Sequence, residues 1–471
     1  MKKLLILLFC PIFGFCQQVQ WVAKVIKSSS DLGGKQYSSR RVIGRPDVFP
    51  QGGDSPNAWA PKDAQDGHDF IEVEFAKAQT VKQIAIFENL NAGCLVKVMA
   101  GTGDGKYKEV FRNKIDIENW KAKYAEYNRG YYFSRKRRKV VAAPEVNVNP
   151  GIEYAVLEEP LENIKALRVV FNFKKTSGDK QIDAIGISDT DQPILPEINT
   201  KKDLENSPYN AQLLYSSKQS FTINALTKDK IYVNIDNDED HSNIYALNFE
   251  GDKLSEPNLL SPSININENY NYIVAIIGDK FITGGSNYKK GTSESGFKFF
   301  KLNGANFGYE KPLEIAAYSN FDTTAGLCAN KDASTILMTI ESDITQGGVD
   351  VYYSKVKEDG TYSYLQNLGK VVNSANDEVN PFLCDDEKTL IFASNGRSSY
   401  GSMDLYFTIR LDDTWKNWSE PINLGPKIND FNSQVSAVYD TKNEILYFTS
   451  FKDDNCQLLK IKLPKSYLTP N

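Results

Sequence analysis

The sequence predicts an all-β protein in which a β-sandwich is followed by a ring of small repeated sheets. Three observations support this fold class. The first half carries short runs of alternating apolar and polar residues, and the second half repeats its own motifs at a nearly constant spacing. The composition, with 25 Tyr, 25 Phe, 31 Gly and 19 Pro, suits short strands joined by many turns.

Length and charge exclude several classes of protein. The 471 residues are 24% charged and 41% hydrophobic, which is typical of a water-soluble chain with substantial cores. A formal net charge of -5 argues against a dedicated nucleic-acid binder. His68 and His241 are the only histidines, so little material exists for histidine-based catalysis or a multi-histidine metal site.

The N-terminus has the layout of a secretory signal peptide. Two lysines precede an apolar run over residues 4–15, which is too short to span a bilayer comfortably. We expect cleavage after Cys16, so that residues 1–16 are removed and the mature protein is exported. Lipidation of Cys16 is the competing interpretation, and the bulky Phe9 and Phe15 count against it. No other stretch is long and apolar enough to cross a membrane.

The cysteines of the mature chain are scattered. They are Cys94, Cys328, Cys384 and Cys456, with no C-x-x-C pair and no spacing typical of a zinc site. We expect buried thiols rather than a bridge between Cys328 and Cys384.

Residues 17–188 are expected to form the sandwich. The runs Phe70–Phe75, Val81–Phe87 and Leu167–Phe173 alternate with a period of two, as strands with one buried face do. Residues 101–105, Gly-Thr-Gly-Asp-Gly, look like a dinucleotide-binding loop. They lie between two strands with no helix after them, so they predict a hairpin turn.

Four separated motifs occur in order in this half. They are Trp21–Val25, Tyr37–Pro50, Ser55–Pro61 and Ile182–Ile187. Together they resemble a discoidin-like, galactose-binding-like jelly roll, a domain that occurs at the front of envelope proteins from Bacteroidota. The resemblance covers nearly the whole first half. It implies ligand-presenting loops at one end of the sandwich, although many such domains bind no sugar.

The chain repeats itself after residues 189–208, which are polar and proline-containing and predict a linker. The segment at Asp332 matches the segment at Asp386, an offset of 54, and the segment at Asn367 matches one 56 residues later. Repeats of about 40 to 55 residues predict propeller blades, because one small sheet cannot bury both of its faces. Five blades are recognisable in residues 209–471, which leaves room for a sixth.

Three phrases of one repeat carry a second resemblance. They are Asp386–Arg397, Tyr400–Tyr406 and Trp418–Gly425, and they resemble the WD40-like PD40 repeats of TolB-type propellers. In Bacteroidota such propellers often join an OmpA-like domain that binds peptidoglycan. This sequence ends at Asn471, just after the last repeat. The resemblance therefore implies partners among OmpA-like or secretion-associated envelope proteins.

Acidic residues suggest two candidate sites. Asp236, Asp238 and Asp240 alternate as the oxygen ligands of a calcium loop do, but the glycine and the bidentate glutamate of an EF-hand are missing. We expect an acidic hairpin without metal or cofactor, and a structural calcium ion is the alternative. Asp350 and Asp404 occupy equivalent positions in two repeats, which favours a structural role, such as accepting backbone N–H groups, over a catalytic pair.

A basic insertion in the first half is the candidate for partner binding. Residues 121–140 carry eight basic residues against one acid, with aromatic residues between them. Guanidinium groups and aromatic faces suit an anionic polymer or an acidic protein surface. An exposed strand and loop without a partner is the alternative. The residues expected to make contact are Tyr131, Tyr132, Arg135, Lys136, Arg137, Arg138 and Lys139.

These observations favour a binding function. Trp21 and Trp59 suit the core or end cap of the sandwich better than stacking on a sugar ring. No motif for a nucleophile or a phosphate loop is recognisable. We expect a non-enzymatic exported protein that binds or scaffolds envelope proteins in the periplasm or at the outer membrane. The alternative is a carbohydrate-binding protein accessory to polysaccharide capture, and a hydrolase using Asp350 or Asp404 is a third class.

Overall fold

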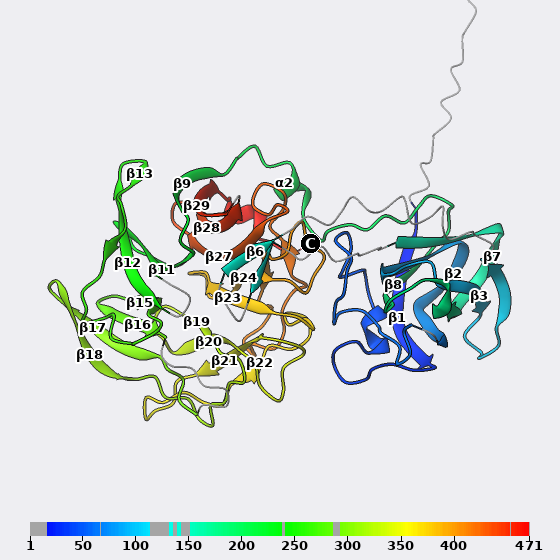
Figure 1. Ribbon diagram of the computed structural model, residues 1–471, viewed down its shortest axis with the longest axis horizontal. Coiled ribbons are helices and arrows are strands. Elements are labelled where there is room, and N and C mark those ends of the chain that lie inside the picture. The colour runs from blue at the N-terminus through cyan, green and yellow to red at the C-terminus, as the bar shows by residue number, and fades with distance from the viewer. Residues whose placement is uncertain are drawn as a thin grey trace, which may run out of the picture.

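The computed structural model describes residues 17–65, 67–113, 151–237, 241–285, 293–452 and 454–470, and the backbone of two short strands at 131–134 and 139–142. Figure 1 shows two β-structured bodies side by side, the first half of the chain in blue to cyan and the second in green to red. The predicted all-β fold class is confirmed. Helical structure in the described ranges is limited to four short turns: η1 (Ser39–Val42), η2 (Phe173–Lys175), α2 (Lys202–Glu205) and η3 (Lys465–Tyr467).

The first body is a six-stranded sheet rolled over its own core. Its strand order is β1-β8-β2-β7-β3-β4, and β1 pairs with β2 as well as with β8. Because β1 meets both strands, the sheet curls back on itself and buries one face. The strands are β1 (Val19–Ser28), β2 (His68–Leu90), β3 (Leu95–Gly101), β4 (Lys108–Arg112), β7 (Gly151–Asn172) and β8 (Gln181–Ser188).

Two of these strands are longer than the sequence pattern suggests. The runs at 70–75 and 81–87 belong to one strand, β2, rather than to two. The pairing of β2 with β7 shifts register between Glu74 and Gln83, which marks the bend between the two runs. The alternation itself is as predicted: Ile71 and Val73 are buried, and the residue between them is not. The glycine-rich segment 101–105 connects β3 to β4 as the expected hairpin.

The second body is a five-bladed propeller. Its five sheets are arranged so that the innermost strands β10, β15, β19, β23 and β27 each contact the next, and β27 contacts β10. The ring therefore closes with five blades, and the described residues form no sixth blade in it. The first blade contains β10 (Phe221–Leu226), β11 (Lys230–Asp236), β12 (Ser242–Glu250), β13 (Lys253–Leu254) and β14 (Asn258–Leu259), and the second contains β15 (Tyr272–Ile277), β16 (Lys280–Gly284), β17 (Lys298–Asn303) and β18 (Asn306–Pro312). The third contains β19 (Gly326–Ala329), β20 (Thr335–Ile340), β21 (Asp350–Lys355) and β22 (Gln366–Asn367), and the fourth contains β23 (Glu378–Leu383), β24 (Thr389–Ser394), β25 (Asp404–Ile409) and β26 (Ile422–Asn423). The fifth contains β27 (Ser433–Asp440), β28 (Ile445–Lys452) and β29 (Asn455–Lys462).

The fifth blade takes its outer strand from the start of the propeller. β9 (Gln212–Ser217) precedes the first blade in sequence, yet it pairs antiparallel with β29 near the C-terminus. Tyr215 in β9 also packs against Phe221 of the first blade, with ring centroids 5.5 Å apart. Both ends of the propeller segment thus hold the same sheet, which fastens the ring without a covalent bond.

The repeat offsets match the strands. β20 and β24 begin 54 residues apart, at Thr335 and Thr389, and β22 and β26 begin 56 residues apart. Within the repeat, Gly347 and Gly401 are required by close approach: a Cβ atom on Gly347 would lie 1.9 Å from the Ala375 carbonyl oxygen. These glycines let the loop of the next blade pack against the repeat.

The segment predicted to be a linker is anchored at both ends. Ile194 is buried against the first body, in a cluster with Phe49 and Phe87. Leu204, on the single turn α2, is 1% exposed and lies in the core of the propeller. Between them, the Asn423 N–H donates to the Asn199 carbonyl oxygen at 2.7 Å. Residues 194–204 are therefore anchored on both bodies, and we call this connecting segment the strap.

Two further predictions concern thiols and membrane spans. Cys94, Cys328, Cys384 and Cys456 are buried free thiols, as predicted, and burial raises the pKa of the Cys328 thiol to about 12. Within the described ranges, no helix has the length and apolar character needed to cross a bilayer.

Candidate functional site

The two recurrent aspartates of the propeller hold backbone. Asp404 accepts hydrogen bonds from the backbone N–H groups of Tyr400, at 2.7 Å, and Gly401, at 3.1 Å. Its third donor is the Asn423 side chain, at 2.7 Å. Burial raises the pKa of Asp404 to about 7, and these hydrogen bonds oppose the rise. The predicted structural role is thus confirmed for Asp404.

Asp350 repeats this arrangement one blade earlier with one bond fewer. Its Oδ2 atom accepts from the backbone N–H of Gln346 and from the Asn367 side chain, both at 2.6 Å. Its Oδ1 atom is buried and has no hydrogen-bond partner among the described residues. Asp350 and Asp404 therefore both fix the loop before a third strand, but Asp350 does so with a single oxygen.

A second asparagine completes each network. In the third blade, Asn373 accepts from the Val351 N–H at 2.8 Å and donates to the Val351 carbonyl at 2.9 Å and to Asn367 at 3.0 Å. Asn429 makes the equivalent bonds in the fourth blade, to Leu405 and Asn423. The repeated Asn-Leu-Gly phrase is therefore a folding motif, because its polar side chains satisfy buried backbone groups.

One concave feature of the propeller is a cavity on its axis. It has a volume of about 150 Å³ and is lined from all five blades, by residues of β10, β15, β19, β23 and β27 among others. Of the predicted site residues, Asp236 is on its wall, and Asp350 and Asp404 are not. The cavity is therefore separate from the repeated aspartate networks.

β-Bulges shape the wall of this cavity. The pairing of the innermost strand with its neighbour skips a residue at Asn224 in the first blade and at Val274 in the second. In the fourth blade it skips Asn380 and Pro381, and Asn380 has a positive φ of 49°. Asparagine tolerates this left-handed conformation better than most residues do. Bulges turn side chains out of the regular alternation, and all four residues line the cavity.

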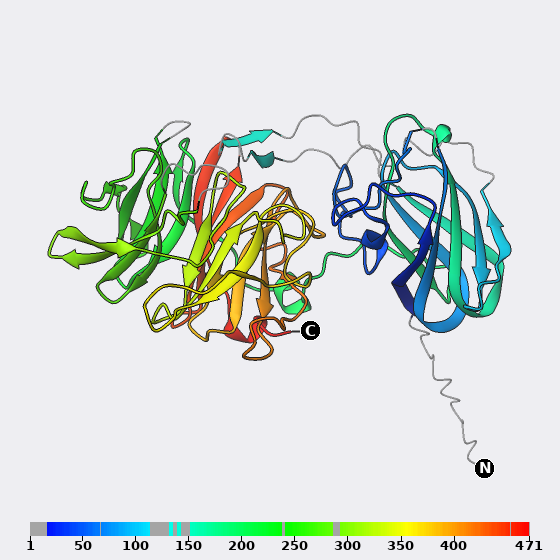
Figure 2. The same ribbon diagram turned by 90° about the horizontal axis from the view of Figure 1, so that it is seen from below.

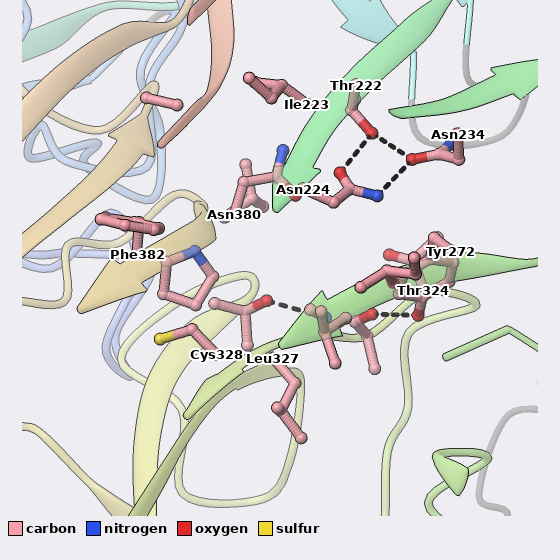
Figure 3. A pocket seen from close by; sticks show the side chains of 18 of the residues that line it. Thr222, Ile223, Asn224, Asn234, Tyr272, Thr324, Leu327, Cys328, Asn380 and Phe382 are labelled. Carbon is pink, nitrogen blue, oxygen red and sulfur yellow. Dashed lines mark hydrogen bonds between the residues drawn. The ribbon is translucent and has the colours of Figure 1, made fainter. Parts of the chain in front are cut away.

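One wall of the cavity is polar. The Asn224 side-chain amide donates to the Asn234 Oδ1 atom at 2.7 Å, and the Thr222 hydroxyl lies within hydrogen-bond distance of both amide oxygens. Figure 3 shows these three side chains grouped on one side of the pocket. In the fourth blade, Asn380 donates to the Val435 carbonyl oxygen at 2.5 Å, which anchors the bulge there.

The opposite wall is mainly apolar, and the hydroxyl groups of Tyr272 and Thr324 there already donate hydrogen bonds within the protein. Figure 3 places Leu327, Cys328 and Phe382 away from the polar group. Ile273 and Val274 add further aliphatic surface. The described lining includes no lysine, arginine or histidine. This arrangement can hold an uncharged group through hydrogen bonds on one side and apolar contact on the other.

Most of the predicted acidic site falls outside the described residues. Asp238 and Asp240 lie there, while Asp236 ends β11 and donates its backbone N–H to the Ser220 carbonyl oxygen at 2.9 Å. Among the described residues, no group of three or more His, Cys, Asp or Glu side chains is arranged to hold a metal ion. The hairpin itself is present, because β11 and β12 pair from Lys230 to Asp236.

The basic insertion is described only in part. Arg135 to Arg138 lie outside the described residues, as do residues 1–16, the predicted signal peptide. Tyr131 and Tyr132 fall in strand β5 (Tyr131–Ser134), and Lys139 begins strand β6 (Lys139–Ala142). The β5 backbone contacts β27 of the propeller, and Figure 2 shows the hairpin beside that body. The prediction that this segment binds a partner stays a prediction.

Trp59 and Trp21 both pack against other residues of the first body. Trp59 is fully buried, and its indole N–H donates to the Ser30 carbonyl oxygen at 3.0 Å. Trp21 packs on Phe87, with ring centroids 5.4 Å apart, and over the backbone of Gly186. The core interpretation is confirmed for Trp59, whereas Trp21 is only partly buried.

Loops of the first body dock on the propeller. Asn57 is 2% exposed and makes two bonds across the boundary: its amide donates to the Gly396 carbonyl oxygen, and its oxygen accepts from the Ala375 N–H, both at 2.8 Å. Gln51 donates to the Tyr400 carbonyl oxygen at 2.6 Å. Further donors from this loop region are Lys35, Gln36 and Arg41, to the carbonyl oxygens of Thr345, Ala375 and Gln346.

Comparisons with known proteins give distant likenesses in fold. No family model and no curated protein matches the chain. An α-L-arabinofuranosidase from Lactobacillus brevis is 11% identical, with 55% of this chain and 93% of that chain covered at a TM-score of 0.34. A gluconolactonase from Xanthomonas campestris is 11% identical, with 58% and 99% covered at 0.30. The family 32 carbohydrate-binding module of EndoD from Streptococcus pneumoniae is 9% identical, with 36% and 97% covered at 0.23. Likenesses this weak carry no information about ligand or activity.

The cavity residues could not be found from the sequence. Asn224 and Asn380 stand in apolar strand patterns, where an isolated asparagine signals a bulge or a buried polar contact equally well. Only the closed ring brings them to one axis. The docking residue Asn57 lies in one of the motifs that resemble a discoidin-like domain, and Gln51 directly follows another, but the pattern gives no sign that their partner is the same chain.

Proposed function

We propose that this protein is a non-enzymatic, exported binding and scaffolding protein of the cell envelope, with protein partners of the OmpA-like or secretion-associated kind. The observation that carries the proposal is the docking of the first body on the propeller through Asn57 and Gln51. Together with the strap at 194–204, this contact holds the loops of both bodies in one fixed arrangement. A fixed arrangement of two loop surfaces suits a scaffold, because less conformational entropy is lost when a partner binds both.

The non-enzymatic part of the proposal is supported by how the propeller uses its recurrent acids. Asp404 is engaged by three donors and Asp350 by two, which makes both part of the fold. Export is supported by the lysines and the apolar run of residues 1–16.

The test uses the full mature chain as bait in envelope extract, with crosslinking to identify the partner and its contact sites. We expect an OmpA-like or secretion-associated protein, crosslinked to loops of both bodies. A variant with residues 135–139 changed to glutamine tests the basic insertion. A variant with five other lysines changed to glutamine, Lys218, Lys228, Lys230, Lys253 and Lys280, controls for the loss of five positive charges. Binding that is equal in both variants would remove the insertion from the proposal. Recovery of no envelope protein would remove the proposal itself.

The same preparation tests the two other classes. A glycan array on the whole chain tests carbohydrate binding, for which saturable binding to one glycan class would be required. A panel of glycoside and ester substrates tests hydrolysis. We expect neither response, and turnover abolished by D404N would replace the scaffold proposal with an enzyme.

A further inference from the structure

The axial cavity has hydrogen-bonding capacity that its own side chains do not use. Asn234 Oδ1 accepts from Asn224 and contacts Thr222, but Asn234 Nδ2 donates no hydrogen bond among the described residues. The Asn224 amide uses one of its two N–H groups. Since amide N–H groups next to a cavity are satisfied by water or by a ligand, this wall is prepared to donate to an oxygen atom.

Charge limits the class of ligand. Asp236 is the acidic residue on the described wall, and the wall contains no basic side chain. An anion would therefore meet a carboxylate and, among the described lining residues, no basic side chain, which is costly away from bulk water. A neutral group meets no such penalty.

The apolar wall limits the ligand further. Leu327, Phe382 and Ile273 offer no hydrogen-bond partner from their side chains. A ring with hydroxyl groups on every edge, such as a hexose, would leave some of them unsatisfied against this wall, at a cost of about 1–3 kcal/mol each. A ring with a polar group on one edge only fits both walls.

The volume of the cavity limits the size of the ligand. The cavity measures about 150 Å³, and an apolar cavity of about 150 Å³ in another protein is known to hold benzene. We propose that the propeller axis binds an uncharged single-ring group with a hydroxyl or amide on one edge, held by Asn224 and Asn234 against Leu327 and Phe382. Such a group can come from a free small molecule or from a tyrosine side chain of a partner.

This site is separate from the loop surfaces of the scaffold proposal, so either proposal can fail without the other. The test is a titration of the full mature chain with phenol, followed by calorimetry or by chemical-shift changes of the asparagine amides. Benzene, benzoate and methyl glucoside are the comparison probes. We expect phenol to bind best, benzene more weakly and benzoate not at all. Methyl glucoside binding while phenol does not, or benzoate binding as well as phenol, would overturn the proposal.

One further probe distinguishes the two sources. N-acetyl-tyrosinamide carries the same phenol ring on a peptide backbone. Tighter binding than phenol favours a tyrosine of a partner, and weaker binding favours a free small molecule. Absence of binding by both phenol and N-acetyl-tyrosinamide overturns the proposal.

Variants assign the polar wall. Asn234→Leu removes the unused donors, and we expect it to raise the Kd for phenol about tenfold or more while improving binding of benzene. The matched control is Asn258→Ala, an exposed asparagine on β14 of the same blade. If Asn234→Leu does not fold, Val274→Phe serves instead, because it fills the cavity from the bulge of the second blade and should abolish phenol binding. Unchanged phenol binding in a folded variant of either kind overturns the proposal.

Discussion

Asp350 and Asp404 occupy equivalent positions in two blades, yet we expect their replacement to lower the free energy of unfolding by different amounts. D404N exchanges an acceptor oxygen for an NH₂ group at a site where both oxygens face N–H donors. D350N can place its NH₂ group at Oδ1, which has no hydrogen-bond partner among the described residues. We expect D404N to lower the free energy of unfolding by about 1–3 kcal/mol, and D350N by less than about 1 kcal/mol.

Urea unfolding of both variants at one pH measures the difference. Equal losses would mean that the two networks are equivalent in spite of their different bonding. A larger loss in D350N would contradict the account of the unpaired oxygen.

Two buried glutamates of the first body make its stability depend on pH. Burial raises the pKa of Glu88 to about 7, against hydrogen bonds from the backbone N–H groups of Gly93 and Cys94. Burial, and then the charge of Glu88, raises the pKa of Glu153 to about 7. A raised folded-state pKa gives stability that is complete below the ordinary pKa and is lost as the pH rises through about 7.

We therefore expect the first body to lose stability between about pH 5 and pH 8, by up to about 3 kcal/mol for each glutamate. Glu153→Gln removes one charge and the repulsion between that charge and Glu88. The free energy of unfolding of this variant should therefore fall less over this pH range. Chemical unfolding at a series of pH values measures the change. Glu158→Gln, an exposed change on the same strand, is the control. Stability that increases with pH in the unaltered protein would contradict the assignment.

At the scale of elements, the strap is held by single side chains rather than by regular structure. α2 is one turn long, and its Leu204 side chain is 1% exposed in the propeller core. Leu204→Ala should lower the free energy of unfolding by about 2–5 kcal/mol, because it leaves a cavity. Leu195→Ala, nine residues earlier at 65% exposure, should have little effect. Thermal unfolding of the two variants compares them, and similar melting temperatures would show that the strap is not docked.

The periodicity of the sequence predicted the positions of the strands well, but it did not predict the bends and bulges within them. The repeat offsets locate β20, β24, β22 and β26, because hydrogen-bonded turns such as that at Asp386 recur with the strands. The bend that joins two runs into β2, and the bulges at Asn224 and Asn380, depend on partner strands far away in sequence. Local pattern contains no information about such partners, so the cavity wall could not be predicted.

At the scale of the whole molecule, two long-range contacts complete the fold. The pairing of β9 with β29 closes the ring, and the loop carrying Asn57 joins the first body to the propeller. The sequence predicted two bodies and a linker, but a surface loop that resembles a ligand-presenting loop gives no sign that its partner is in the same chain. For this reason the residues predicted from the sequence to form functional sites did not include Asn57 and the contact between the two bodies.

The docked arrangement depends on Asn57, whose amide and oxygen both face backbone groups of the propeller. Asn57→Asp places a second acceptor 2.8 Å from the Gly396 carbonyl oxygen and buries a charge whose remaining bond to the propeller is that from the Ala375 N–H. We expect the two bodies to separate while each stays folded and tethered by the strap. Small-angle X-ray scattering should then show a larger radius of gyration at neutral pH. At a pH low enough to protonate the new carboxyl, its O–H can donate to Gly396 again, and the compact form should return.

The control for this change is Asn206→Asp, which adds the same charge at an exposed position. It should scatter as the unaltered protein does at every pH. If Asn57→Asp also scatters as the unaltered protein does, the interface does not depend on this residue. If it separates at neutral pH and stays apart on acidification, the contact depends on the amide itself rather than on the charge. If the compact form returns on acidification only in Asn57→Asp, a single protonation controls the arrangement of the whole molecule. This outcome would identify the side chain at position 57 as the contact that holds the two bodies together.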